Sequence, residues 1–467
     1  MSPSFCRARR AYGLHFAFIA LLPGVLVASA AAAPDGPTES APRGARPLGL
    51  DTWTLDNGLK VVFVARQGAP LTSVHIVYHV GSRDEKAGTR GITRVVRELM
   101  LQGSPRVRPG GHSYLIARVG GRLSSHGDEN VTSFTNTVPT PYVELALALE
   151  AERMRGLFFT DETVAELRQA ALRARQRQVE TSPLGKALEL LRGSLFGEHP
   201  YAQSGTGHIA DLRRLSRADC EAFLSRHFVP ANATLVLAGA GDAEEWRRLV
   251  DRHFGGLRAG TLPKHPPAPA AHVGQGPRRV NLPLELPMVA VGAPLPALGS
   301  RDRAALIVAA EVLGGGSAGR LQTRLVGPQA PAVAAGGASS LYEDAGMLVL
   351  FAVHERTRPQ EEVRRALLDE VASLRDRPVP APELAEARLR AATAVAARLS
   401  TASGLAAQVG RAAVVEGDPE LALSEPEALL NVSATDVGRV ANAFLKEDRL
   451  SVLLMMPEAL GPQERVP

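Results

Sequence analysis

The sequence predicts an α+β protein with two tandem homologous domains, each an antiparallel sheet flanked by helices. Three observations lead to this prediction. A Pro- and Gly-rich stretch at 262–279 reads as a linker between two segments of domain size. Both segments show the same order of strand-like and helix-like hydrophobic patterns. Both also end in a helix that starts at a serine followed three residues later by an aspartate, and that leads into an apolar strand.

The N-terminal domain is expected to span 49–261. Its predicted elements are a strand at 73–80, a helix at about 89–102, a strand at 131–138, a helix from Pro141, a long helical region, a helix capped by Ser216 and Asp219, and a strand at 233–238. Gly103 and Ser104 end the first helix, and a Gly-rich stretch precedes the second strand.

The C-terminal domain, expected at 280–460, repeats this order. Its predicted elements are a strand at 287–293, a helix at about 300–313, a strand at 347–353, a helix from Pro359, a long helical region, a helix capped by Ser433 and Asp436, and a strand at 450–455. Duplication of one domain explains this agreement. Chance similarity between two ordinary α+β halves is the alternative.

The first 33 residues are predicted to be a secretory signal peptide, followed by a flexible lead at 34–48. Three arginines precede an apolar run at 14–27, and an alanine-rich tract follows it. A membrane anchor is the alternative, but the run contains Pro23 and Gly24 and is shorter than the roughly 20 residues that span a bilayer. Cleavage would lower the formal net charge from +5 to about +2 and leave Cys220 as the only cysteine, so no internal disulfide is expected.

Local patterns offer few candidates for chemistry. His75 and His79 can share one strand face, but two such histidines are more often structural than metal ligands. Cys220 lies on an apolar helical face and is expected to be buried. The glycines at 314–316 follow a helix, which indicates a chain reversal and no phosphate site. Basic residues are dispersed and aromatic residues make up only 4%, so no nucleic-acid partner is expected.

Motifs along nearly the whole mature chain resemble the pitrilysin/insulinase family of zinc metallopeptidases. They are LDNGLKVVFV at 55–64, VYHVGSRDEKAGTRG at 77–91, ELMLQGS at 98–104, TVP at 137–139, LEAERM at 149–154, GEHPY at 197–201, FVPANATLVLAG at 228–239 and GRLQTRLV at 319–326. The resemblance implies two related domains arranged as a clam around a central cavity.

The resemblance also implies an inverted zinc motif, H-x-x-E-H, with a distant glutamate as a further ligand. On this chain the motif falls on Arg94-Val95-Val96-Arg97-Glu98, and the distant ligand falls on Ala174, or on Arg175 after a one-residue slip. A guanidinium has no lone pair to offer a metal, and one carboxylate cannot hold zinc alone. We therefore expect no intact catalytic residue and no metal ligand set. Arg94 and Glu98, four residues apart, are expected to form an ion pair in the vacated position.

Substrate contacts implied by the resemblance are altered as well. An Arg and a Tyr that bind substrate in many active members correspond to Val326 and Val333. The edge strand that binds peptide is expected around Ser124, Thr132 and Phe134, with Ser124 in place of an Asn. Peptide addition to a strand edge uses backbone groups and therefore does not depend on these side chains.

These observations predict an exported protein, in a bacterial periplasm, that binds peptides or unfolded protein segments without cleaving them. It is expected to pair with an active homologous zinc peptidase as its non-catalytic subunit. The alternatives are a zinc-dependent metalloendopeptidase with a composite or atypical site, and a stand-alone peptide-binding protein. No cofactor is expected unless the peptidase alternative holds, and no membrane span is expected in the mature chain.

Overall fold

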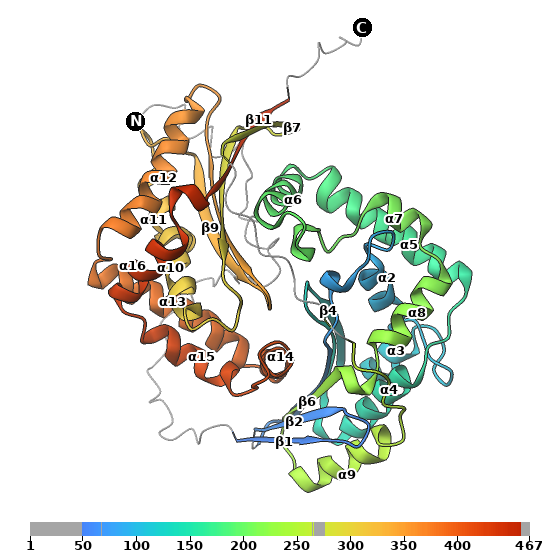
Figure 1. The fold of residues 1–467 in the computed structure, drawn as a ribbon. Helices are drawn as coiled ribbons and strands as arrows, with labels where there is room; N and C mark the ends of the chain where they lie inside the picture. Colours follow the sequence, from blue (N-terminus) through green and yellow to red (C-terminus); the bar gives the residue numbers. More distant parts are fainter. Residues whose placement is uncertain (1–48, 67, 264, 266–275, 459–467) are drawn as a thin grey trace. The chain divides into compact units, whose positions relative to one another are not determined.

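The computed structural model of the chain contains two mixed β-sheets (Figure 1). Residues of the first half, up to Gly239, form one sheet, and residues of the second half, from Arg278 on, form the other. The structure describes residues 49–66, 68–263, 265 and 276–458. The predicted signal peptide, the lead at 34–48 and most of the predicted linker lie outside these residues. The predicted domain limits and the clam arrangement around a cavity stay predictions.

The first sheet has six strands in the order β1-β2-β6-β3-β5-β4. They are β1 (Leu50–Thr54), β2 (Lys60–Ala65), β3 (Leu71–Tyr78), β4 (Arg122–Gly127), β5 (Thr132–Pro139) and β6 (Ala233–Gly239). Its helices are α2 (Ile92–Leu99), α3 (Gly111–Arg118), α4 (Val143–Arg155), α5 (Asp161–Arg175), α6 (Pro183–Phe196), α7 (Ile209–Arg214), α8 (Arg217–His227) and α9 (Ala243–Phe254).

The second sheet has the order β7-β11-β8-β10-β9, which is the order of the first sheet without its first edge strand. Its strands are β7 (Arg278–Leu282), β8 (Met288–Leu295), β9 (Ala334–Leu341), β10 (Gly346–Val353) and β11 (Ser451–Pro457). Its helices are α10 (Arg303–Gly314), α11 (Arg320–Leu325), α12 (Gln360–Asp376), α13 (Ala381–Leu399), α14 (Ala402–Arg411), α15 (Leu421–Leu430) and α16 (Ala434–Phe444).

The matching strand order and directions support the duplication that the sequence predicts. The two predicted caps are present, because Ser216 accepts the Asp219 N–H at 3.2 Å and Ser433 accepts the Asp436 N–H at 3.1 Å. The prediction of antiparallel sheets is wrong in one respect. β2 pairs with β6 in parallel, and β7 pairs with β11 in parallel. Long helical connections separate the members of each pair along the chain, and such connections permit parallel pairing.

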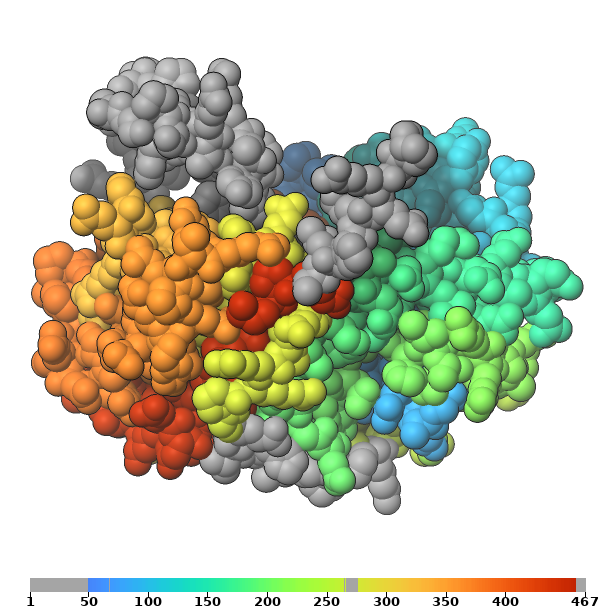
Figure 2. All heavy atoms as spheres, turned by 90° about the horizontal axis from the view of Figure 1, so that it is seen from above, coloured from blue at the N-terminus to red at the C-terminus, as the bar shows by residue number. Residues whose placement is uncertain are grey.

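The central strands of each sheet are buried on both faces, and their second face is covered by a helix from the other half. In the first sheet, Val236 and Ala238 pack against Leu405 and Val409 of α14. In the second, α6 packs on β8, where a Cβ added to Gly292 would stand 2.8 Å from the Leu195 side chain. Figure 2 shows a green segment of the first half side by side with yellow and red segments of the second half.

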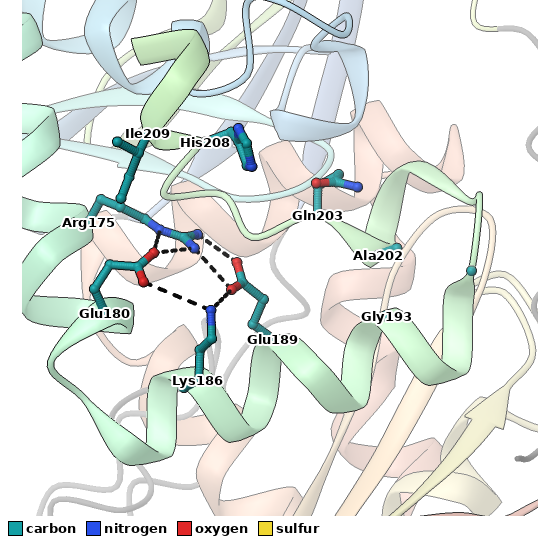
Figure 3. A pocket seen from close by; sticks show the side chains of 10 residues that line it. Arg175, Glu180, Lys186, Glu189, Gly193, Ala202, Gln203, His208 and Ile209 are labelled. Atoms are coloured by element: carbon teal, nitrogen blue, oxygen red, sulfur yellow. Dashed lines mark hydrogen bonds and ion pairs between the residues drawn. The ribbon is translucent and has the colours of Figure 1, made fainter. Parts of the chain in front are cut away.

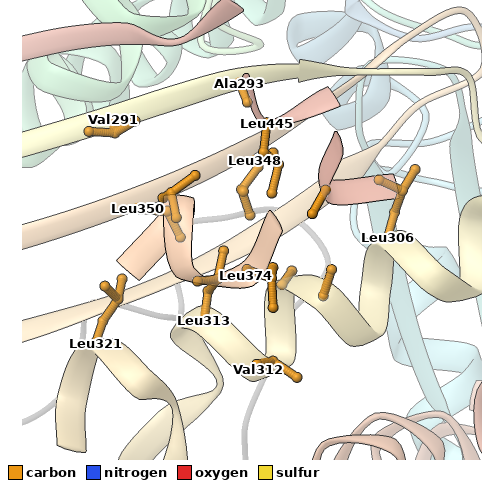
Figure 4. Packing of buried hydrophobic residues seen from close by; sticks show 14 of the residues in the cluster. Val291, Ala293, Leu306, Val312, Leu313, Leu321, Leu348, Leu350, Leu374 and Leu445 are labelled. Carbon is orange, nitrogen blue, oxygen red and sulfur yellow. The ribbon is translucent and has the colours of Figure 1, made fainter. Parts of the chain in front are cut away.

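Apolar side chains fill the space between each sheet and its own helices. In the second half, Leu306 and Leu313 of α10 face Leu348 and Leu350 of β10 (Figure 4). The equivalent cluster in the first half includes Val95 of α2 beneath the sheet. Among the described helices, none has the length and apolar character needed to cross a lipid bilayer.

Candidate functional site

The helix that carries the predicted motif positions is fixed by its apolar face and its N-terminus. Ile92, Val96 and Leu99 of α2 are at most 2% exposed. The Glu85 carboxylate accepts the N–H of Gly91 at 2.6 Å and that of Thr93 at 3.0 Å, which satisfies donors at the start of the helix. Burial raises the pKa of Glu85 to about 7 although these hydrogen bonds oppose the shift.

This packing directs Arg94, Arg97 and Glu98 to the opposite face of α2, where all three are partly exposed. Glu98 pairs with Arg97, with 3.1 Å between Oε1 and Nη2. The expected Arg94–Glu98 ion pair is therefore wrong, because the adjacent Arg97 takes the carboxylate. Within the described residues no carboxylate forms an ion pair with Arg94. Burial, together with repulsion from Arg97 and Arg177 against attraction from Glu98, lowers the pKa of Arg94.

Arg97 reaches from α2 to the end of the edge strand β4. A Cβ added to Gly127, the last residue of β4, would stand 2.9 Å from Nη1 of Arg97. The Nε of Arg97 is buried and has no hydrogen-bond partner in the described structure. The Arg97 guanidinium therefore lies against the end of β4, and at least one of its N–H groups makes no hydrogen bond within the described residues.

The distant ligand position is buried and belongs to a different charge network. Ala174 is 4% exposed and carries no polar group. Arg175 binds Glu189 at 2.6 Å and Glu180 at 2.7 Å, and Lys186 joins the same carboxylates (Figure 3). These side chains line a pocket of about 380 Å³. Because two carboxylates already occupy Arg175, this pocket has little capacity for another anion.

Of the three residues predicted to bind substrate, only Ser124 lies on the edge strand, where it is exposed. Thr132 and Phe134 lie on β5, inside the sheet, and both are fully buried. The Thr132 hydroxyl donates to the Val80 carbonyl at 2.9 Å, and the Phe134 ring packs under the Arg153 guanidinium. The expectation that they form part of the edge is corrected, because β4 separates β5 from that edge.

The other sequence candidates serve the structure. His75 is buried, bonds Thr135 at 2.8 Å and has its pKa lowered to about 3, first by burial and then by His126. His79 instead bonds Glu343 at 2.7 Å. Cys220 is fully buried, and burial raises the pKa of its thiol to about 12. A buried protonated thiol is a poor nucleophile, as expected for a packing residue.

Sequence reasoning missed a charged turn between β4 and β5 that binds α14 of the second half and, within the first half, Arg192 and Tyr201. Asp128 in this turn pairs with Arg411 at the end of α14, and the next residue, Glu129, pairs with the buried Arg192 at 2.7 Å. Asn130 bonds the Tyr201 hydroxyl at 2.6 Å. Asp128 and Arg411 are 283 residues apart, so no local signal could have paired them.

The described residues do not fit a zinc ion at the motif position. They contain no group of three or more His, Cys, Asp or Glu side chains that could hold a metal. At the motif itself two of the three polar side chains are guanidiniums, which cannot coordinate a cation.

Comparisons with known proteins place this fold and site in context. Residues 60–205 match the family described as insulinase (peptidase family M16), and residues 214–390 match the peptidase M16 inactive domain. A Helicobacter pylori protein named Zinc protease PqqE is 22% identical, covering 87% of this chain and 93% of that protein. A solved protease structure from the same species has a TM-score of 0.82 at 22% identity, covering 88% of this chain and 100% of that one.

An Arabidopsis thaliana protein is also similar. It is named as a probable mitochondrial-processing peptidase subunit beta and is 24% identical, covering 89% of this chain and 78% of that protein.

Proposed function

Because this chain belongs to the M16 (insulinase/pitrilysin) peptidase family, in its two-domain bacterial type, we propose that it is a non-catalytic subunit that binds peptides and pairs with an active zinc peptidase homologue. The observation that carries this proposal is the pair of arginines, Arg94 and Arg97, at two positions of the motif.

The chemistry of those positions supports the proposal. A catalytic zinc site in a protein needs about three ligands and one open position. At the motif only Glu98 offers a carboxylate, and Arg97 already binds it at 3.1 Å. An arginine at the position of the general base cannot accept a proton from water, since its guanidinium stays protonated.

Pairing with a homologue is supported by one relative's name. The Arabidopsis thaliana protein is called a subunit, which indicates that similar chains act within assemblies. We propose the same for this chain, with an active homologue supplying the metal. Peptide binding is supported by β4, an edge strand whose outer backbone groups have no strand partner in the described structure.

We also propose that the mature protein is exported to a bacterial periplasm after cleavage of the segment 1–33. The basic start, apolar run and alanine tract of that segment support this. N-terminal sequencing of protein from the periplasmic fraction of the native host should give a start near Pro34. Recovery of an intact N-terminus from the cytoplasm would contradict it.

The central test compares metal content and cleavage. The purified mature chain, with the Helicobacter pylori relative as positive control, is assayed for bound zinc and for hydrolysis of a mixed peptide library. We expect less than stoichiometric zinc and no cleavage. Stoichiometric zinc with cleavage that a chelator stops would overturn the proposal in favour of a metalloendopeptidase, which is the activity that the name of this relative states.

A second measurement tests pairing. The chain is co-expressed with each neighbouring homologue that carries an intact H-x-x-E-H motif and is analysed by light scattering. We expect a heterodimer with one of them. A monomer in every combination would leave the stand-alone peptide-binding protein as the function.

A further inference from the structure

We propose that Arg97, which reaches the end of the free edge strand β4, forms together with Arg94 and Arg177 a receptor for a carboxylate group of an extended peptide. The inference rests on the proposed function, because it requires the motif position to hold no zinc and β4 to accept a peptide strand. It adds a ligand class that the loss of metal binding does not by itself imply.

An excess of uncompensated positive charge marks this location. The three guanidiniums have one carboxylate among them, that of Glu98, and Arg97 binds it. Arg94 and Arg177 have no ion-pair or hydrogen-bond partner within the described residues. Since guanidiniums do not lose their protons, an anion from outside would relieve this repulsion.

Geometry supports the same conclusion. Arg94 and Arg97 lie three residues apart on α2 and therefore on neighbouring positions of one helix face. Arg177 follows α5, which packs against α2, and its charge acts on Arg94. The Arg97 guanidinium reaches the last residue of β4, where Gly127 has no side chain to displace it. A peptide strand that pairs with β4 would pass this group at one end.

A carboxylate is the ligand that this arrangement fits. Arginine binds carboxylates with two parallel hydrogen bonds, and the partly exposed Arg94 guanidinium has no partner within the described residues. The carboxylate can be the free C-terminus of a peptide or an acidic side chain within it. The pocket at Arg175 is a weaker candidate, because Glu180 and Glu189 already neutralise that arginine.

The test uses three N-acetylated valine–serine peptides of equal length, titrated calorimetrically into the mature chain. The first ends in a free carboxylate, the second ends in an amide, and the third ends in an amide and contains one internal glutamate. We expect the first or the third to bind about tenfold tighter than the second, since charged hydrogen bonds contribute that much. Preference for the first identifies the C-terminus, and preference for the third identifies a side chain.

Variants assign the effect to the arginines. Arg94→Gln and Arg97→Gln should each remove most of the preference, measured as the ratio of the affinities for the carboxylate and amide peptides. Arg122→Gln, at the exposed far end of β4, is the matched control and should change affinity less than about twofold. Equal affinity for all three peptides, loss of preference in the control, or no binding by any peptide would overturn the inference.

The outcome also separates the two proposals. Equal affinity for the three peptides in a zinc-free, inactive protein would refute the carboxylate receptor and leave the non-catalytic function standing. Stoichiometric zinc with chelator-sensitive cleavage would instead refute the proposed function itself.

Discussion

Replacement of Asp128 by asparagine should weaken the contact between the two halves of the molecule. The Asp128 side chain is 8% exposed and pairs with Arg411, whose side chain is 27% exposed. Burial alone would raise the pKa of Asp128, but Arg411, His126 and the Val131 N–H together hold it well below its usual range. The ionised form is therefore the one that the fold stabilises.

The magnitude follows from the burial of the pair. Removal of one partner from a buried ion pair costs about 3–5 kcal/mol, because the remaining charge is left without compensation. Because the Arg411 side chain keeps some access to water, we expect Asp128→Asn to lower the free energy of unfolding by about 3 kcal/mol. Asparagine retains an oxygen that can still accept the N–H groups of Asn130 and Val131, both at 2.8 Å in the present structure. The loss of stability therefore measures the removal of the negative charge and not the removal of these hydrogen bonds.

Urea unfolding at pH 7, followed by circular dichroism and tryptophan fluorescence, measures this loss. The control is Glu221→Gln, which breaks an exposed pair with Arg217 and should leave the free energy of unfolding nearly unchanged. The ordinary pKa of Asp128 is 3.8 and the folded value is lower, so its contribution is present above pH 3.8 and is lost as the pH falls below it. A loss no greater than that of the control, or one that does not shrink at pH 3, would refute the reasoning.

Three further predictions use the same unfolding measurements or chemical labelling. Leu405→Ala, which removes an α14 side chain from the apolar cluster between α14 and the first sheet, should lower the free energy of unfolding by about 2–5 kcal/mol. Leu389→Ala, at a side chain that is 61% exposed, is the control and should lower it by less than about 0.5 kcal/mol. Equal losses would contradict the packing. Because the pKa of His75 is lowered to about 3, the unfolded chain binds more protons than the folded chain below pH 6.5, and the free energy of unfolding falls as the pH falls. His75→Gln should reduce this loss of stability between pH 7.5 and 5 by about 2 kcal/mol. An unchanged loss would contradict a neutral His75. Cys220 should react with a thiol reagent only in urea, as mass spectrometry would show, and rapid labelling of the native protein would contradict its burial.

Local signals in the sequence were sufficient for the elements that were predicted in each half and for the order of those elements. The serine caps at Ser216 and Ser433 and the apolar strands after them depend only on neighbouring residues, and both are present in the structure. Strands β1, β2, β7 and β9 were not among the predicted elements, and the parallel pairing of β2 with β6 and of β7 with β11 joins residues that lie far apart in the chain.

The site could be predicted only in part, for the same reason. The helical spacing of Arg94, Arg97 and Glu98 was correct, but the choice of ion-pair partner depended on side-chain direction, which spacing does not determine. The placement of Thr132 and Phe134 required the strand order of the sheet. The cover that α14 gives to the first sheet depends on contacts across more than half of the chain.

The two faces of α2 explain how the motif position can change while the fold persists. Its inner face supplies buried side chains such as Val95 and Val96, and Glu85 caps its start, so none of the contacts that hold the helix involves Arg94 or Arg97. Under the proposed function, the partly exposed outer face carries Arg94 and Arg97, while the apolar packing of the inner face keeps the helix in place. A charged residue at Val96, which is fully buried, would place an unpaired charge in the apolar core and destabilise the helix. The side chains that hold the helix and the motif positions therefore lie on opposite faces of α2, and under the further inference the unpaired charge on the outer face favours an anion.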